Sequence, residues 1–257
     1  MNNAPEITTS MPKRLESPEF WVEHIPFVFY LIPQLKPSVI VELGTHSGNS
    51  FFAFCQATKE NNIPIKCYAV DTWRGDKHAG YYSEAVYQDV LKHKNEYYKD
   101  SAVLLRMTFN EALSIFPGKS IDLINIDGLH TYEAIKHDFE NWLPKLSNHG
   151  TVLIHDTQIK MKDFGVWKFW TEVSKQYPSF EFHHGCGLGV LAIGNNVPTS
   201  ILKFIEEANK SNQYSNLFKE QGQLVYRQYK KLQLKRNIKK IPRLPLIIIR
   251  RLKMLLS

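Results

Sequence analysis

The sequence predicts an α/β protein whose mostly parallel sheet has seven strands, the last one antiparallel, with helices flanking it. Short apolar runs alternate with stretches whose apolar residues recur every three or four positions, which indicates alternating strands and helices. The first strands are continuously apolar, as parallel strands covered on both faces are. The last two strands are separated by a short link with Gly185 and Gly187. Because a parallel crossover needs a dozen or more residues, these two must run antiparallel.

The elements are expected in the following order. A helix over residues 20–35 packs over the sheet, with Pro26 and Pro33 limiting its regular length. The expected strands are 38–43, 65–70, 102–106, 121–126, 151–154, 180–183 and 188–193. The expected helices that follow the first strand are 49–60, 84–97, 110–116, 131–143, 165–176, 198–210 and 216–233.

Length and charge suggest four segments. A chain of 257 residues can bury a full core in one domain. We expect an N-terminal helical segment (1–36), the main domain (37–197), C-terminal helices (198–229) and a basic tail (230–257). The net charge of +7 is concentrated in this tail, which holds ten Lys and Arg residues and no acid. The rest of the chain has 22 basic and 25 acidic residues, so the tail is expected to have a partner of its own.

Cysteine usage and the N-terminal sequence indicate a cytoplasmic protein. The three cysteines, Cys55, Cys67 and Cys186, have neither disulfide-framework nor metal-cluster spacing, which favours a reducing compartment. Residues 1–17 are polar and lack the apolar run of a signal peptide. No apolar segment is long enough to span a bilayer.

The most informative motif follows the first strand. Glu42 precedes a turn with Gly44 and Gly48, and the helix after it directs free N–H groups at whatever is bound there. The second strand ends at Asp71, where a ribose diol is gripped in folds of this kind. The position expected for the middle glycine of a dinucleotide fingerprint is His46, which argues against a pyrophosphate ligand. An ordinary strand–helix turn without a ligand remains the alternative.

A second cluster follows the fourth and fifth strands. Asp127 and Asp156 end neighbouring strands, so they should lie side by side at the carboxyl edge of the sheet. Two adjacent carboxylates repel unless a cation or a proton lies between them, which predicts a divalent metal. Oxygen ligands favour Mg²⁺, and His130 as a third ligand allows Mn²⁺ or Fe²⁺. Alternatively, Asp156 simply caps a turn. By strand alternation, His155 should face away from Asp156.

The loop over residues 72–83 is the expected substrate site. It is rich in aromatic and polar side chains that suit a sugar, namely Trp73, Arg74, Asp76, Tyr81 and Tyr82. A solvated loop with one aromatic plug is the alternative. His130 is the first candidate for general base and His78, in this loop, is the second.

These residues resemble a class I S-adenosylmethionine-dependent methyltransferase. Glu42-Leu-Gly-Thr-His-Ser-Gly48 matches the first motif of that family. The runs 126–134, 142–146 and 149–156 are similar to a bacterial subfamily of sugar O-methyltransferases and cephalosporin-hydroxylase-like enzymes. The resemblance covers about residues 38–194. It departs from some relatives in having His155-Asp156 where they have Glu-Asp.

The resemblance implies a Rossmann-like methyltransferase sheet, S-adenosylmethionine as cofactor and O-methylation of a sugar hydroxyl in a surface polysaccharide or glycoconjugate. It implies a divalent metal held by Asp127 and Asp156. The candidate catalytic residues are then His130, Asp127 and His78. The candidate cofactor-binding residues are Glu42, Gly44, Thr45, Gly48, Ser50, Asp71, Thr72, Thr108, Phe109 and Asp127.

Two other functions compete with this one. A metal-dependent hydroxylase would use the acid and histidine cluster, but would not explain Glu42 to Gly48 or Asp71. A nucleic-acid-binding protein would use the basic tail, but the rest of the chain is acidic and the Asn-Pro-Pro-Tyr pattern of base methylation is absent. We therefore expect no nucleic-acid partner.

The tail mixes basic residues with isoleucine and leucine and is interrupted by Pro242 and Pro245. It is too short and too charged to span a bilayer, and it suits an anchor on anionic lipid at the inner face of the plasma membrane. Packing against the main domain or a homo-oligomer contact would also explain it.

Overall fold

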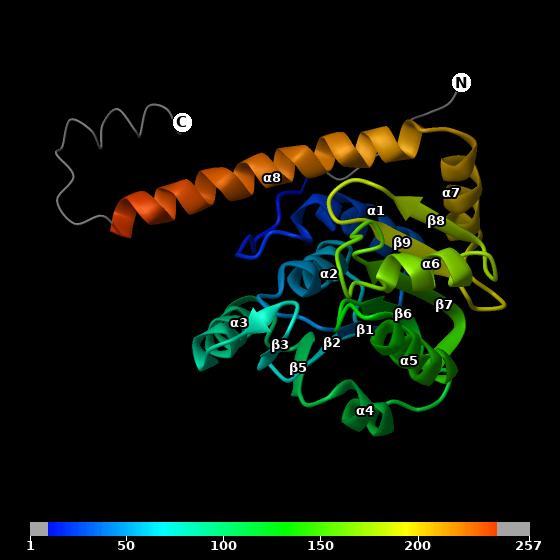
Figure 1. Cartoon of the computed structure of the whole chain (residues 1–257), viewed down its shortest axis with the longest axis horizontal. Helices are drawn as coiled ribbons and strands as arrows, with labels where there is room; N and C mark the ends of the chain where they lie inside the picture. Colours follow the sequence, from blue (N-terminus) through cyan, green and yellow to red (C-terminus); the bar gives the residue numbers. More distant parts are fainter. Residues whose placement is uncertain (1–9, 241–257) are drawn as a thin grey trace.

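A seven-stranded sheet lies at the centre of the structure, a computed structural model that describes residues 10–240 (Figure 1). The strand order is β5-β2-β1-β6-β7-β9-β8, and β9 is antiparallel to its two neighbours. The predicted sheet, with its last strand antiparallel, is confirmed. The strands are β1 (Val39–Leu43), β2 (Lys66–Asp71), β5 (Ala102–Arg106), β6 (Ile121–Ile126), β7 (Leu146–His155), β8 (Ser179–Phe182) and β9 (Leu188–Ala192).

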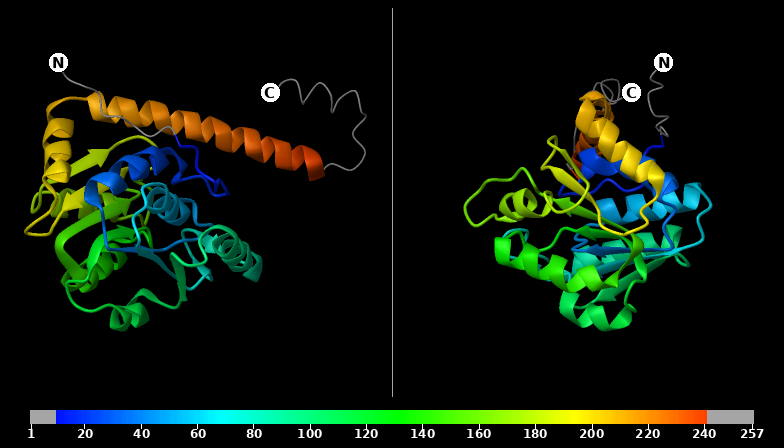
Figure 2. Two further views of the ribbon diagram at one scale, coloured as in Figure 1. Left: turned by 180° about the vertical axis from the view of Figure 1, so that it is seen from behind. Right: turned by 90° about the vertical axis from the view of Figure 1, so that its right-hand side faces the viewer.

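Helices cover both faces of the sheet, and each face has its own apolar core. One core contains side chains of α1 (Ile25–Leu35), α2 (Asn49–Glu60), α3 (Glu84–Tyr97), α7 (Thr199–Lys210) and α8 (Gln213–Lys240). The other contains side chains of α4 (Phe109–Ala112), α5 (Tyr132–Trp142) and α6 (Val166–Val173). The views in Figure 2 show these two layers. Burial on both faces accounts for the continuously apolar strands.

Several boundaries differ from those expected. The expected helix over 20–35 is a short 3₁₀ turn, η1 (Val22–His24), followed by α1, because Pro26 suits only the first turn of a helix. The fifth parallel strand begins at Leu146 rather than at residue 151. Residues 109–115 form α4 and the 3₁₀ turn η2 (Leu113–Ile115), and η3 (Leu143–Lys145) follows α5. The expected loop 72–83 contains a small hairpin, β3 (Gly75–Asp76) and β4 (Gly80–Tyr81).

Helix α8 is longer than the helix expected over 216–233, because it continues into the predicted basic tail. The boundary expected between residues 229 and 230 lies within this helix. The remainder of the predicted tail, 241–257, is outside the described residues. Among residues 10–240, no helix is both long enough and apolar enough to cross a membrane.

Candidate active site

The glycine turn after β1 brings the carboxyl ends of three strands together. Gly44 has a φ of +88°, and its N–H donates to the carbonyl of Val70 at the end of β2. A Cβ at residue 44 would lie 2.0 Å from the carbonyl oxygen of Asp127, which follows β6. Only glycine allows this close approach of two backbones. The turn therefore places β1, β2 and β6 at one rim.

The side chain of Asp71 holds this turn in place through hydrogen bonds to its backbone. Its Oδ2 accepts hydrogen bonds from the backbone N–H groups of Thr45 and His46, both at 2.9 Å, and its Oδ1 accepts from Trp73 at 2.6 Å. The indole Nε1 of Trp73 donates to the carbonyl of His46 at 2.9 Å. The acid at the end of β2 thus holds the glycine turn in place, and it also lines the cavity described below.

Two expected cofactor residues lie beneath the turn and do not reach the cavity. Glu42 is fully buried, and its Oε1 accepts a hydrogen bond of 2.9 Å from Asn125 Nδ2. Burial raises the pKa of Glu42 to about 8, against the lowering effect of its hydrogen-bonding neighbours. Gly48, with a φ of +80°, precedes α2, and a Cβ there would press on the ring of Phe52. Both residues support the turn, and their contact with a cofactor stays a prediction.

A cluster of two carboxylates and two imidazoles lies where β6 and β7 end. His130 Nε2 is 2.8 Å from Asp156 Oδ2 and 3.6 Å from Asp127 Oδ1. His155 Nδ1 is 3.1 Å from Asp127 Oδ1 and 3.3 Å from Asp156 Oδ1. The predicted neighbours Asp127, His130 and Asp156 are therefore brought together.

His155 belongs to this cluster, contrary to expectation. Strand alternation predicts that it faces away from Asp156, but β7 ends at His155 and Asp156 adopts a left-handed conformation with a φ of +62°. The alternation rule holds only inside an extended strand. The ring of Trp21 stacks on His155 with centroids 5.5 Å apart, which holds the imidazole against Asp127.

The cluster is close to electrical balance without a metal. Burial acts to lower the pKa of His130, but the hydrogen bonds and charges of Asp127 and Asp156 outweigh burial and raise the pKa to about 9. The pKa of His155 is raised for the same reason, again against burial. Although burial opposes it, the two imidazoles lower the pKa of Asp156. These shifts favour the protonated form of both imidazoles and the charged form of Asp156 when no metal is bound.

A divalent cation would also fit this cluster. Ligand atoms of Asp127, His130 and Asp156 lie within 4.8 Å of one another. Two carboxylates and an imidazole are a donor set that suits Mn²⁺ or Fe²⁺, and with water completing the shell also Mg²⁺. A metal would replace the proton on His130 Nε2, since a coordinating imidazole must be neutral.

A cavity of about 700 Å³ opens at this rim and runs from the glycine turn to the cluster. Eight of the ten expected cofactor residues line it: Gly44, Thr45, Ser50, Asp71, Thr72, Thr108, Phe109 and Asp127. All three candidate catalytic residues, His130, Asp127 and His78, line it as well. The volume is within the range of small-molecule sites. Backbone N–H groups, acids and an aromatic ring along one wall suit an adenosyl group with a charged methionine portion.

The expected substrate residues divide into two groups. Asp76 and Tyr82 line the cavity, whereas Trp73, Arg74 and Tyr81 do not. Trp73 is buried in the core below the turn, and Tyr81 points outward with 84% of its surface exposed. Trp73, Arg74 and Tyr81 are therefore not placed to meet a molecule in this cavity, contrary to the expectation that all five residues contact the substrate.

Phe164 is a site residue that no pattern in the sequence indicates. Its ring stacks on His130 with centroids 5.0 Å apart and on His78 at 4.6 Å. The N–H of Gly165 donates to the carbonyl of His130 at 2.8 Å, which ties the loop after β7 to the loop after β6. Phe164 thus covers the cluster and orients both candidate bases.

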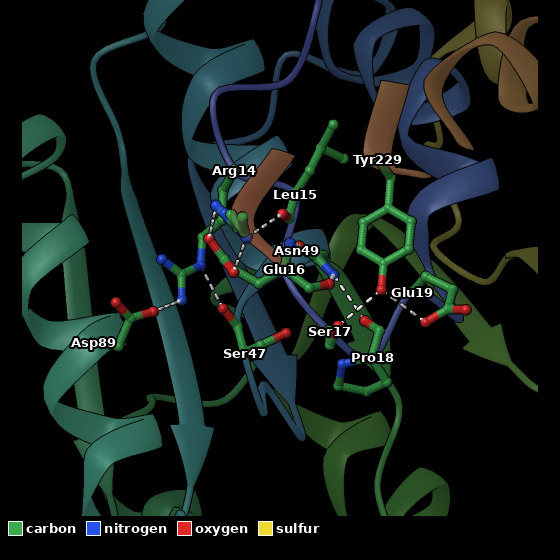
Figure 3. A network of polar contacts seen from close by, with 11 residues as sticks. Arg14, Leu15, Glu16, Ser17, Pro18, Glu19, Ser47, Asn49, Asp89 and Tyr229 are labelled. Atoms are coloured by element: carbon green, nitrogen blue, oxygen red, sulfur yellow. Dashed lines mark hydrogen bonds and ion pairs between the residues drawn. The ribbon is translucent and has the colours of Figure 1, made fainter. Parts of the chain in front are cut away.

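The N-terminal segment forms another wall that sequence reasoning missed. Pro18, Phe20 and Trp21 line the cavity. Figure 3 shows how the preceding residues are held. Asn49 Nδ2 donates to the carbonyls of Glu16 and Pro18, at 2.8 and 2.9 Å. The guanidinium of Arg14 donates to the carbonyl of Ser47 and to Asp89.

Comparison with known proteins agrees with this geometry. Residues 41–157 match a family described as a methyltransferase domain. This methyltransferase match includes the glycine turn, Asp71 and the cluster. Together with the fold, it supports a class I S-adenosylmethionine-dependent methyltransferase.

Solved methyltransferase structures share the fold. The putative caffeoyl-CoA O-methyltransferase of Staphylococcus aureus is 18% identical, with a TM-score of 0.53 over 66% of this chain and 82% of its own. The O-methyltransferase NovP is 14% identical, with a TM-score of 0.53 over 67% and 80%. The O-methyltransferase TomG of Streptomyces achromogenes, solved in complex with SAM, is 12% identical, with a TM-score of 0.51 over 71% and 83%. At sequence identities this low, the structural similarity is evidence for a shared fold and for nothing further.

One curated relative is much closer in sequence. An uncharacterized protein of Sinorhizobium fredii is 44% identical over 191 residues, which are 74% of this chain. The chain spans about a fifth of the length of that relative, because the match covers 21% of it.

Proposed function

We propose that this protein transfers a methyl group from S-adenosylmethionine to a hydroxyl oxygen of a sugar in a surface polysaccharide or glycoconjugate, in the cytoplasm. The observation that carries the proposal is the single cavity that joins the glycine turn to the cluster of Asp127, His130, His155 and Asp156. A cofactor site and a group of acids and bases for the acceptor are thereby next to each other.

The wall near the glycine turn would hold the cofactor. Bound S-adenosylmethionine supplies an electrophilic methyl carbon, so the protein mainly positions the two reactants. We expect the backbone at Gly44 and Thr45 to meet the methionine portion. Asp71 and Thr72 would lie at the ribose, and Thr108 with Phe109 at the adenine.

His78 is the better candidate for general base when no cation is bound. The raised pKa of His130 keeps it protonated near neutral pH, so it cannot accept a proton in that state. Burial and the neighbouring His130 lower the pKa of His78, so its imidazole is neutral. The His78 ring also lines the cavity, where the acceptor would lie. His78 is therefore able to take the hydroxyl proton.

Asp127, His130 and Asp156 would hold a divalent cation. A bound cation would lower the pKa of a hydroxyl that it coordinates, as it does for water. The two carboxylates have free oxygen lone pairs for this purpose, and Phe164 limits the movement of the His130 ring.

The acceptor end of the cavity suits a sugar. His46 and Tyr82 stack with centroids 4.0 Å apart and present a flat aromatic surface. Asp76 and His78 add polar groups at the same end. Aromatic faces with a few convergent polar groups are typical of carbohydrate sites.

Methyl transfer can be measured with methyl-labelled S-adenosylmethionine and glycans prepared from cells that lack the protein. We expect a mass gain of one methylene group per acceptor, lost in His78→Ala and Asp127→Asn and kept in the outward-facing control Tyr81→Ala. If no hydroxyl compound receives the label, the proposal is contradicted. Oxygen consumption with Fe²⁺ in place of methyl transfer would also contradict it and would favour the hydroxylase.

A further inference from the structure

Helix α8 has one face buried and one face open. Its 28 residues give it a length of about 40 Å. Phe218, Val225 and Tyr229 are buried against the body, and Gly222 brings the helix so close to η1 that a Cβ there would lie 2.3 Å from the carbonyl oxygen of Glu23. Figures 1 and 2 show the helix lying across the top of the molecule, with its C-terminal end extending past the body.

The open face combines leucines with cations. We call outer face the five exposed residues Leu224, Arg227, Lys231, Leu234 and Lys235. At 100° per residue they fall within an arc of about 100°, which at its N-terminal end also contains the exposed Glu220. The two leucines are 44% and 46% exposed. Within residues 10–240, none of these three cations forms an ion pair, whereas Lys230 and Arg236, on the side toward the body, pair with Glu19 and Glu16.

Charge distinguishes this helix from the rest of the molecule. Its exposed cations are Lys219, Arg227, Lys230, Lys231, Lys235 and Arg236, and Glu220 is its one acid. Outside residues 230–257 the chain has more acids than bases. The sequence after α8 adds Arg243, Arg250, Arg251 and Lys253 among isoleucines and leucines. Among the described residues, the positive charge is therefore concentrated on α8.

We propose that the outer face of α8 docks on an anionic lipid bilayer. Leucines interleaved with unpaired cations on one helical stripe are typical of helices that lie in the plane of the membrane surface, with apolar side chains among the headgroups. Anionic headgroups attract each Lys or Arg near the surface. A second copy of the chain on this face would bring cation against cation. Nucleic acid would leave the leucines exposed to water.

This surface is connected to the cavity. Ser17 Oγ and Glu19 Oε2 hydrogen-bond the hydroxyl of Tyr229 on the inner side of α8, at 2.8 and 3.1 Å (Figure 3). The residues that follow, Phe20 and Trp21, line the cavity. Docking through α8 would hold one wall of the cavity next to the bilayer. If the protein has the proposed function, the cavity would then be within reach of an acceptor carried at the membrane surface.

Vesicle sedimentation with the full chain tests the proposal and needs neither cofactor nor acceptor, so its outcome is independent of the methylation assay. The probes are vesicles of phosphatidylcholine alone and vesicles that also contain phosphatidylglycerol. The test variant is Arg227→Glu with Lys231→Glu and Lys235→Glu. The matched control makes the same charge change at exposed lysines elsewhere, Lys92→Glu with Lys99→Glu and Lys175→Glu.

We expect binding to the phosphatidylglycerol vesicles only. Because each cation near the surface contributes about fivefold, the α8 variant should bind at least about 100-fold more weakly, and the control variant much less so. A second variant, Leu224→Ser with Leu234→Ser, keeps every charge and should also bind more weakly. Circular dichroism shows whether each variant is folded.

Three results would overturn the proposal. In the first, the α8 variant binds as tightly as the parent, or binding is lost only on removal of residues 241–257. In the second, the control variant loses as much as the α8 variant, which would indicate bulk charge rather than this face. In the third, light scattering shows a dimer that the α8 variant converts to monomer with vesicle binding unchanged; the face would then be a protein interface.

Discussion

The Nε2 atom of His130 lies 2.8 Å from Oδ2 of Asp156, in a cluster where His155 Nδ1 lies 3.1 Å from Asp127 and 3.3 Å from Asp156. Two neighbouring carboxylates need a positive charge between them, which is why the sequence predicts a metal. In this arrangement His130 and His155, whose protonated forms the two acids favour, can supply that charge. A cation at this position must therefore compete with a proton, and several predictions depend on that competition.

Stability without metal should fall as pH rises through the pKa of His130. That pKa, about 9, exceeds the ordinary value of 6.5, so the stabilising contribution is complete below pH 6.5 and is lost between pH 6.5 and 9. Its size is about 3 kcal/mol at most. Thermal unfolding in a chelator should show a smaller decline over this window for His130→Gln than for the parent. Parallel declines would show that His130 is not protonated in the fold.

Metal affinity should depend on pH in the opposite direction. Because binding displaces the proton of His130, the apparent affinity for Mn²⁺ should rise about tenfold per pH unit below about pH 9. Calorimetry in two buffers of different ionisation enthalpy should show release of about one proton per ion. Asp156→Asn should weaken binding strongly. Binding without proton release would mean that His130 is not a ligand.

Glu42 should be mostly protonated at neutral pH, since burial raises its pKa to about 8. Glutamine resembles the protonated acid, so Glu42→Gln should be about as stable as the parent near pH 4.5 and more stable by about 2 kcal/mol at pH 6, where the unfolded parent is already ionised. As pH rises, the parent loses stability from pH 4.5 to about 8, and the variant should avoid about 2 kcal/mol of loss between pH 6 and 8. Denaturant unfolding at these pH values measures this. A variant that is much less stable at pH 6 would show that the carboxylate form is required.

Gly44 should tolerate no side chain. Gly44→Ala would force a Cβ against the carbonyl of Asp127 at positive φ, and we expect a loss of about 2–4 kcal/mol together with loss of cofactor binding. Gly80→Ala is the matched control, because Gly80 also has a positive φ, +81°, but a Cβ there meets nothing within 4 Å. The control should lose only about 1 kcal/mol, from backbone strain. Equal losses would remove the argument that Gly44 is needed for close packing.

The fold and much of the site follow from local patterns. Apolar runs predict the strands, and the short link around Gly187 predicts the antiparallel end of the sheet. Gly44, Asp71 and Asp127 lie at one rim because parallel strands end at the same edge. These inferences need only chain order and strand direction.

Features that depend on contacts between distant parts of the chain could not be predicted in this way. Trp21 meets His155, and Tyr229 meets Ser17, across long separations in sequence. The inclusion of His155 depends on a single left-handed residue, Asp156, which ends strand alternation. Helix α8 continues past residue 233 where Arg236 pairs with Glu16, a contact that no helical pattern reveals.

Calorimetric titration of S-adenosylmethionine into the full chain tests the central claim most directly. We predict that one molecule binds per chain. Asp71→Asn should bind it at least tenfold more weakly, because asparagine cannot accept all three hydrogen bonds that order the glycine turn. Tyr81→Ala, outside the cavity, should bind as the parent does. No binding by the folded parent, or an equal loss in both variants, would contradict the assignment of this cavity to the cofactor.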